Sequence, residues 1–486
     1  MLLQKPAFLL FYHARAAEAS FGEWLGVLWH GLSLDCTVAG YVTAFPVLVA
    51  LASFWIPLSQ RVWRIVLTVY FSLIALVTAA IFAVDLNLYG YWGFRLDGSV
   101  LIYLSDPGEA LASASWGEVL RQILIMLVYA GAMIWSYRWI LRLFRVEPVP
   151  LRGRIVPTVA TLLIGGLTFL AIRGGVTVAT ANVSKVYFSS NMFLNHAATN
   201  PVFSFLSSVG DNENYAEAYP FFEEERRKTL FEELRGNRPG ADAGTPRLLR
   251  SDRPNVVLIL LESFGRTIMD ETVNGEPVMP NMQRFKREGV WFENFFANSF
   301  RTDRGQVAVL CGFPAQTTMS IMKLPRKSAT LPSLARSLGR EGYRSVFMYG
   351  GDLNFTNQAS YMYATGWQQL TWQKDLHFDA PTSKWGYADD VVVDLFGDEV
   401  EALGRAEQPF LAGLLTLSSH EPFEVPFAKF DDKLLNAMAF SDAQIGRLID
   451  RLRESPVWDN LLVVLVADHG LSLIHISEPT RLLSIS

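Results

Sequence analysis

Apolar residues are concentrated in long uninterrupted runs in the first third of the chain. Each of four runs approaches the roughly 20 apolar residues that a helix needs to cross a bilayer. The alternative, buried helices of a large soluble protein, fits poorly with four such runs in close succession. We therefore predict a transmembrane anchor over residues 1–175. Its four clear spans are Cys36–Ile56, Ile65–Val84, Ile123–Leu141 and Ile155–Ile172.

Arginines in the segments between these runs predict their orientation. Arg61 and Arg64 lie between the first two runs, whereas the 87–115 loop holds only Arg95. Five more arginines surround the join of the last two runs: Arg138, Arg142, Arg145, Arg152 and Arg154. Because cytoplasmic loops carry an excess of Lys and Arg, we expect the arginine-rich joins inside the cell and everything after Arg173 outside the membrane.

The opening segment MLLQKPAFLLFY is apolar but too short to span a bilayer. No signal peptide with a cleavage site follows it. Two interpretations stay open. The segment is either the stump of a truncated first span, which would restore an inside amino terminus and five spans, or a short surface segment.

Residues 176–254 differ in composition from the segments on either side. The stretch NVSKVYFSSNMFLNHAATNPVFSF is polar and aromatic, which suits a segment that lies on the membrane surface. The stretch FFEEERRKTLFEELRG is charged and helical in pattern, and it continues into residues rich in Gly, Pro and Ala. We predict juxtamembrane helices followed by a linker.

From Asn255 onward, short continuous apolar runs alternate with helical stretches. This pattern is typical of a parallel sheet that is covered by helices on both faces. The predicted strands are 255–261, 345–349, 409–415 and 461–467. Each is followed by polar residues, and ligands of open α/β sheets bind outside the carboxyl ends of the strands. We therefore expect these polar residues to share one crevice.

Three of these polar residues have the chemistry of metal ligands. Glu262 directly follows the first predicted strand, and Asp468 and His469 follow the last. Two oxygen donors and one nitrogen donor suit Mn²⁺ or Zn²⁺ better than Ca²⁺. An Asp-His pair is usually structural, so its position after a strongly apolar strand is what favours a metal site here.

A candidate nucleophile lies in the stretch ANSFRTDRGQVAVLCGFPAQ. Thr302 precedes an apolar run, and a helix is expected to begin near Asp303 or Arg304. A threonine hydroxyl becomes a good nucleophile when a base or a metal lowers its pKa. Arg304 and the amides of the helix start could then neutralise phosphate oxygens. The alternative is that Thr302 is an ordinary helix N-cap.

Charge and cysteine content narrow the class of function. The net charge is -5 and the acidic residues are dispersed, so no nucleic-acid partner is predicted. Two cysteines, Cys36 and Cys311, supply neither a disulfide framework nor a metal-ligand cluster. Both are interpreted as packing residues.

Seven segments occur in the order typical of the sulfatase-like branch of the alkaline phosphatase superfamily. They are NVVLILLESF, MPNMQRFKREGVWFENFFAN, FRTDRGQVAVLCGFP, TLPSLARSLGREGYRSVFMYGGDLNFTN, WGYADD, LSSHEPF and VVLVADHG. Together with the helical anchor, in which HGLSLD also fits, they most closely resemble the membrane-anchored lipoteichoic acid synthase and phosphoglycerol transferase family. The resemblance extends to Gly470.

The resemblance implies a fold class: a multi-span α-helical membrane anchor followed by an α/β sulfatase-like domain, truncated at its carboxyl end. It also implies a bacterial inner (plasma) membrane protein with an extracytoplasmic, periplasmic catalytic domain. A single Mn²⁺-like ion, with Zn²⁺ or Mg²⁺ as alternatives, would be held by Glu262, Thr302, Asp468 and His469. Thr302 would also be the nucleophile, and His420 would contact the substrate phosphoglycerol group.

Two further residues, Trp385 and Asp389, fall in a segment that recurs in the family. For these residues a packing role is an equal alternative to a functional one.

The implied reaction moves a phosphoglycerol-type head group from a membrane phospholipid to an acceptor hydroxyl through a phospho-threonine intermediate. Phosphatidylglycerol is the expected donor, and a glycan or glycolipid is the expected acceptor. Arg304 would hold developing charge, and His420 could protonate a leaving oxygen. Phosphoethanolamine transfer and a non-catalytic lipid-binding role of the same fold are the alternatives. Sulfatase activity is not expected, because CGFPA lacks the Arg and the spacing of a formylglycine site.

The chain departs from the family pattern at two places. Gram-positive synthases carry Thr-Ser-Asp at the nucleophile, where this chain has Thr302-Asp303-Arg304. A family histidine near Tyr349 is also absent. Both departures leave donor and acceptor open, although the TDRG form resembles that of Gram-negative members.

The carboxyl end does not continue as the family does. LSLIHISEPTR resembles one reading frame of a transposase sequencing adapter, so residues 471–486 are interpreted as an artefact. Residues 255–470 would then be an incomplete catalytic domain. Because an apolar strand edge would be exposed, we expect the chain as written to be unstable and inactive.

Overall fold

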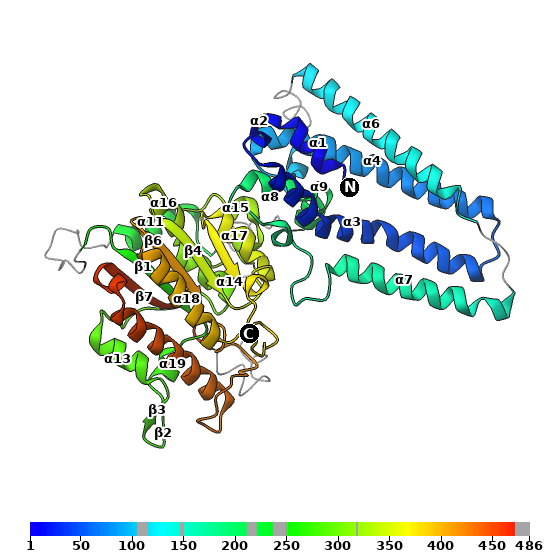
Figure 1. The fold of residues 1–486 in the computed structure, drawn as a ribbon. Helices are drawn as coiled ribbons and strands as arrows, with labels where there is room; N and C mark the ends of the chain where they lie inside the picture. Colours follow the sequence, from blue (N-terminus) through cyan, green and yellow to red (C-terminus); the bar gives the residue numbers. More distant parts are fainter. Residues whose placement is uncertain are drawn as a thin grey trace.

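The chain forms a group of long helices and an α/β part, with short helices packed between them (Figure 1). The computed structural model describes residues 1–104, 115–145, 150–210, 221–236, 249, 251–316 and 319–471. The expected combination of an apolar helical part followed by an α/β domain is confirmed.

In the part of the chain that the structure describes, four helices are long and apolar enough to cross a membrane, as the sequence predicted. They are α3 (Phe21–Trp55), α4 (Gln60–Trp92), α6 (Trp116–Leu141) and α7 (Ile155–Arg173). In Figure 1, α4 lies beside α6 and α3 beside α7. With a rise of about 1.5 Å per residue, α3 and α4 are each near 50 Å long, so both exceed the roughly 30 Å of bilayer hydrocarbon.

The amino-terminal segment packs against the ends of these helices. It forms α1 (Gln4–Phe11) and α2 (His13–Ala16). Phe8 and Leu9 are fully buried in a cluster that includes α4 residues. A buried ion pair, with 2.6 Å between Lys5 Nζ and Asp35 Oδ2, ties α1 to α3. The sequence did not predict this packing.

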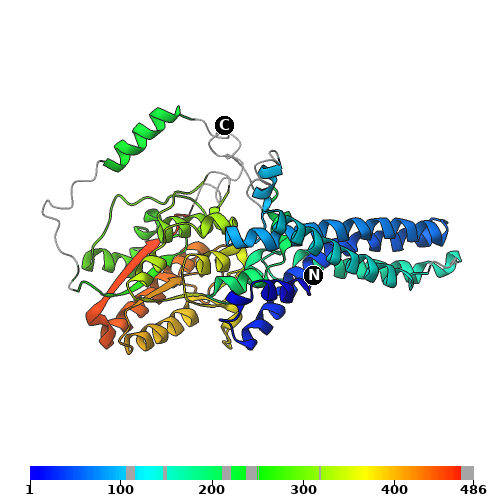
Figure 2. The ribbon, with the colours of Figure 1, turned by 90° about the horizontal axis from the view of Figure 1, so that it is seen from above.

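The juxtamembrane segment packs on the same helix ends. It contains η3 (Val183–Val186), α8 (Met192–Ala198) and α9 (Pro201–Ser208). The side chain of Asn191 caps α8 and that of Asn200 caps α9. Asn200 also donates from Nδ2 to Asp35 Oδ1 at 2.7 Å. The predicted charged helix is α11 (Glu224–Gly236), which Figure 2 shows apart from the sheet.

The α/β part is built on a five-stranded sheet in the order β5-β4-β6-β1-β7, in which every pairing is parallel. The strands are β1 (Asn255–Leu261), β4 (Arg344–Tyr349), β5 (Gln369–Trp372), β6 (Phe410–Leu415) and β7 (Leu461–Ala467). All four predicted strands are confirmed. The short strand β5 was missed, because four residues carry too little periodicity to mark a strand.

Helices cover both faces of the sheet, as predicted (Figure 1). One face packs against α13 (Pro280–Glu288), α18 (Asp389–Gly404) and α19 (Lys433–Glu454). The other packs against α14 (Thr302–Cys311), α16 (Leu334–Arg340) and α17 (Gln358–Ala364). Alternate residues of β1 enter the two cores, with Ile259 on one side and Leu260 on the other. This two-sided burial explains the unbroken apolar strand sequences.

The remaining elements are short. They are α12 (Arg266–Met269), β2 (Thr272–Val273), β3 (Glu276–Pro277), α15 (Pro325–Ser328), and the 3₁₀ turns η1 (Gly98–Leu104), η2 (Leu151–Gly153), η4 (Ile321–Lys323), η5 (Phe355–Asn357), η6 (Gln373–Asp375) and η7 (Pro456–Asn460).

Strand β7 is an edge of the described sheet. Among the described residues it pairs only with β1, and all seven of its residues are half-buried. An apolar edge of this kind exposes unpaired backbone groups to other chains. The predicted adapter-derived segment lies outside the described residues from position 472 onward.

Candidate metal centre and nucleophile

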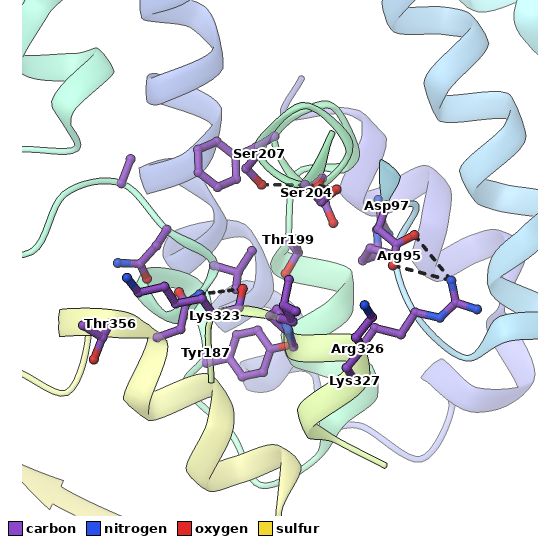
Figure 3. Close-up of a pocket in the computed structure, with 18 of the residues that line it drawn as sticks. Arg95, Asp97, Tyr187, Thr199, Ser204, Ser207, Lys323, Arg326, Lys327 and Thr356 are labelled. Atoms are coloured by element: carbon purple, nitrogen blue, oxygen red, sulfur yellow. Dashed lines mark hydrogen bonds and ion pairs between the residues drawn. The ribbon is translucent and has the colours of Figure 1, made fainter. Parts of the chain in front are cut away.

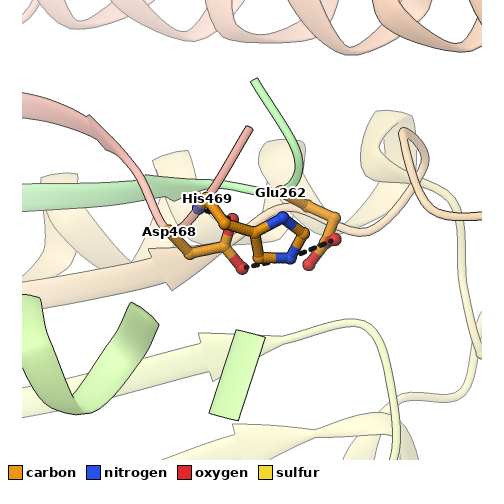
Figure 4. Close-up of side chains that lie close together, drawn as sticks. All are labelled: Glu262, Asp468 and His469. Atoms are coloured by element: carbon orange, nitrogen blue, oxygen red, sulfur yellow. Dashed lines mark hydrogen bonds and ion pairs between the residues drawn. The ribbon is translucent and has the colours of Figure 1, made fainter. Parts of the chain in front are cut away.

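The carboxyl ends of β1 and β7 bring the three predicted ligands together. The two strands pair in register up to Leu261 and Ala467. Glu262 follows β1, and Asp468 and His469 follow β7, so the three side chains converge (Figure 4). One ligand atom from each lies within 4.8 Å of the others. His469 Nε2 is 3.5 Å from Glu262 Oε1 and 3.6 Å from Asp468 Oδ2. All three residues are buried.

Hydrogen bonds fix the orientation of both carboxylates. Asp468 Oδ1 accepts the backbone N–H of Ser263 at 3.1 Å and that of His469 at 2.7 Å. Ser263 also donates from Oγ to Glu262 Oε1 at 2.8 Å. Its positive φ of 62° is an uncommon backbone conformation for serine, and it lies directly beside the ligands. Ser419, in the loop after β6, donates to the Glu262 carbonyl oxygen at 2.6 Å.

The second Asp468 oxygen is a candidate ligand atom for a cation. Among the described residues, Asp468 Oδ2 is buried with no hydrogen-bond partner. Burial, and next the charge of Glu262, raise the pKa of Asp468 well above its usual value. A divalent ion would satisfy this oxygen and compensate the two carboxylates. The residues present therefore fit a metal, while the donor set admits more than one ion.

Thr302 lies at the first position of α14 and faces this cluster. Its Oγ1 donates to Glu262 Oε2 at 3.1 Å and is 3.3 Å from His469 Nε2. The N-cap of α14 is Arg301, and no side chain caps the helix. The alternative of Thr302 as an ordinary N-cap is therefore wrong, and its hydroxyl is directed to the candidate metal ligands instead.

A close contact that sequence reasoning missed positions α14. At Gly305, an added Cβ would lie 2.1 Å from the Asp468 carbonyl oxygen. Only glycine allows this approach of the helix to the end of β7. The glycine of the TDRG segment was the available signal, since a glycine inside a helix is unfavourable unless packing requires it.

The side chain of Arg304 lies beside Phe300, with 5.7 Å between its guanidinium carbon and the ring centre. It also lines a small cavity with Phe313 and Ile321. Its predicted role in neutralising a phosphate stays a prediction.

His420 lies in the loop that follows β6, at the wall of a cavity of about 650 Å³. Its ring centre is 4.6 Å from that of Trp385. Trp385 donates from Nε1 to the Glu421 carbonyl oxygen at 2.8 Å, and His420 Nδ1 is 2.8 Å from the same atom. The predicted contact of His420 with a substrate stays a prediction.

Asp389 holds the loop that carries His420. Its carboxylate accepts the N–H of Leu417 at 2.7 Å and that of Ser418 at 3.2 Å. It also accepts the Ser441 hydroxyl at 2.7 Å. Burial raises the pKa of Asp389, although these donors oppose that shift. The structure thus gives Asp389 a positioning role, consistent with the packing alternative.

The sequence of the α/β part matches the model of a known protein family. Residues 254–481 match the family model described as Sulfatase. The sulfatase-like α/β domain expected from the sequence, preceded by helices long enough to span a membrane, is thereby confirmed.

Relatives of the sulfatase-like domain carry two functional names. Phosphoglycerol transferase I of Xanthomonas campestris pv. campestris is 33% identical over 241 residues, covering 45% of this chain and 34% of the relative. Lipoteichoic acid synthase 1 of Bacillus subtilis is 28% identical over 247 residues, covering 44% and 36%. The chain thus spans about a third of the length of these relatives.

A solved structure from Vibrio parahaemolyticus, described as a protein in the alkaline phosphatase superfamily, is 26% identical. It has a TM-score of 0.45, and the match covers 51% of this chain and 64% of that one.

Proposed function

We propose that the protein is a membrane-anchored, metal-dependent phosphoglycerol transferase. The observation that carries this proposal is the position of Thr302. Its hydroxyl donates to Glu262 and is 3.3 Å from His469 Nε2, which lies 3.6 Å from the buried Asp468 Oδ2. The names of the relatives, phosphoglycerol transferase and lipoteichoic acid synthase, support the same class of reaction.

In the first step, Thr302 Oγ1 attacks the phosphorus of a phosphatidylglycerol head group. An oxygen–phosphorus bond forms at Thr302, and the bond between phosphorus and the diacylglycerol oxygen breaks. The hydroxyl proton of Thr302 moves toward Glu262 Oε2, which it already faces, and diacylglycerol leaves with a proton from the site. His420 can supply that proton or hold a phosphate oxygen.

In the second step, an acceptor hydroxyl attacks the phosphorus of the phospho-threonine. The bond to Thr302 breaks, Oγ1 regains its proton from Glu262, and the proton of the acceptor hydroxyl moves to His420. Atoms balance over the two steps: one head group moves, and one diacylglycerol is released. The acceptor is a hydroxyl of a glycan or glycolipid.

Glu262, Asp468 and His469, with Thr302, would hold the metal, for which Mn²⁺ is our choice. When bound, it would stabilise negative charge on the phosphate and lower the pKa of a coordinated hydroxyl. We place the catalytic domain on the outer, periplasmic side of a bacterial plasma membrane, where a lipid donor in the bilayer can reach it.

Diacylglycerol release tests this function. The full chain, expressed from the resequenced gene, is placed in liposomes that contain acyl-labelled phosphatidylglycerol and Mn²⁺. Release by wild type should fall by roughly 10³-fold or more in Thr302→Ala, because the attacking oxygen is lost. Thr302→Ser keeps a hydroxyl and should retain measurable release. Equal release from wild type and Thr302→Ala would contradict the proposal.

A further inference from the structure

A cavity of about 870 Å³ lies where the membrane helices meet the α/β domain (Figure 3). On the membrane side, its walls come from the segment after α4 and from η3, α8 and α9. On the other side, they come from η4, α15, η5 and the residue that precedes α14. Arg326 of α15 bridges the two sides, donating to Ser99 Oγ at 2.6 Å and lying 3.4 Å from Asp97 Oδ1.

The wall carries more positive than negative charge. Its cations are Arg95, Arg301, Lys323, Arg326 and Lys327, and its carboxylate is Asp97. Arg95 is paired with Asp85, and Arg326 with Asp97. Within the described residues, the exposed side chains of Arg301, Lys323 and Lys327 have no carboxylate at ion-pair distance. These three cations are therefore available to an anion.

A buried histidine adds an unused polar atom to the wall. His196 is 4% exposed, and its Nδ1 is 3.0 Å from the Tyr89 hydroxyl. Burial, and next the charge of Arg95, lower the pKa of His196 to about 3, so the ring is neutral. Across the described chain, Nε2 of this ring finds no hydrogen-bond partner.

The cavity also has apolar walls and lies at the membrane side of the domain. Phe94, Phe203, Leu324 and Phe355 line it together with the cations. A pocket with both kinds of wall suits an amphipathic anion better than a free inorganic ion. Arg301 lies in the wall and directly precedes the candidate nucleophile Thr302 in the chain.

We propose that this cavity binds the phosphodiester head group and adjoining glycerol backbone of an anionic phospholipid. Lys323, Lys327 and Arg301 neutralise the phosphate, and the apolar wall covers the acylglycerol part. This assignment rests on the proposed function, since it gives the lipid donor a place to be held before its phosphorus reaches Thr302. Both parts of the molecule are needed to form it.

Binding of acyl-labelled phosphatidylglycerol to the detergent-solubilised full chain tests the assignment by fluorescence polarisation. Replacing both lysines, Lys323→Gln and Lys327→Gln, should weaken binding roughly 10- to 30-fold, because each cation near an anionic lipid contributes about fivefold. Arg287→Gln removes one charge from the exposed side of α13 and should leave affinity unchanged. Matching melting temperatures show that all variants are folded.

Competition with unlabelled ligands distinguishes a lipid phosphate from inorganic phosphate as the group that the cavity binds. Unlabelled phosphatidylglycerol should displace the probe, whereas phosphatidylcholine and inorganic phosphate should not at equal concentration. Unchanged binding in the double lysine variant, or displacement by inorganic phosphate as effective as by lipid, would overturn the proposal. If wild type binds the probe in a lysine-dependent way but releases no diacylglycerol, the proposed lipid-binding pocket is supported and the proposed reaction is rejected.

Discussion

Gly305 packs so closely on Asp468 that a β-carbon at position 305 would lie 2.1 Å from the Asp468 carbonyl oxygen. The contact sets the distance between α14, which begins at Thr302, and the strand end that supplies two candidate ligands. The candidate nucleophile and the candidate metal centre are thus positioned by backbone packing as well as by side chains.

Gly305→Ala should therefore weaken metal binding and transfer. Alanine would by itself favour the helix by about 1 kcal/mol, but its β-carbon would push α14 away from Asp468. Gly339→Ala is the matched control, since Gly339 also lies in a helix and a β-carbon there meets nothing within 4 Å. Titration calorimetry measures the Mn²⁺ affinity of the two variants. Equal affinities for the two variants would contradict the packing argument.

Asp468→Asn should reduce Mn²⁺ affinity by at least roughly tenfold. The amide oxygen can still accept the N–H of Ser263 and of His469, so the fold is kept. Its NH₂ group, however, cannot ligate a cation as Oδ2 can. Asp431→Asn, in an exposed loop, is the control. Metal content after dialysis, measured by mass spectrometry, should fall only in the first variant, and equal content in both would reject the assignment.

Asp389 should make the free energy of unfolding depend on pH. Burial raises its pKa above the usual 3.8, so the folded state binds more protons than the unfolded state between the two values. The stability that this group adds is thus present below 3.8 and falls as pH rises through the folded pKa, by at most about 1.4 kcal/mol per pH unit. Asp389→Asn cannot titrate.

Thermal unfolding with chelator present, from pH 4 to 7, measures this effect. The stability of wild type relative to Asp389→Asn should decline as pH rises, since other groups titrate in both proteins. A difference that stays constant or grows with pH would show that burial does not control this carboxyl group.

Much of the α/β domain could be predicted because its signals are local. The strands ending at Leu261 and Ala467 are unbroken apolar runs, and the position of Glu262, Asp468 and His469 directly after them placed the ligands at one sheet edge. The helices that are long enough to span a membrane could be predicted equally well, because their apolar runs are long.

What could not be predicted depends on contacts between distant segments. The strand β5 is recognisable by its pairing with β4, and its four residues alone do not mark it. The hydrogen bond from Ser419 to Glu262 joins positions 157 residues apart. The packing of α1 on the membrane helices and the cavity beside Arg326 likewise form only when separate parts meet.

The most direct test of the central claim is the covalent state of Thr302. The full chain is incubated with phosphatidylglycerol and Mn²⁺, quenched in acid, digested and analysed by peptide mass spectrometry. The account predicts one glycerophosphoryl group on the peptide that contains Thr302, absent in Thr302→Ala. Diacylglycerol release with the adduct on another residue, or release that persists in Thr302→Ala, would contradict it.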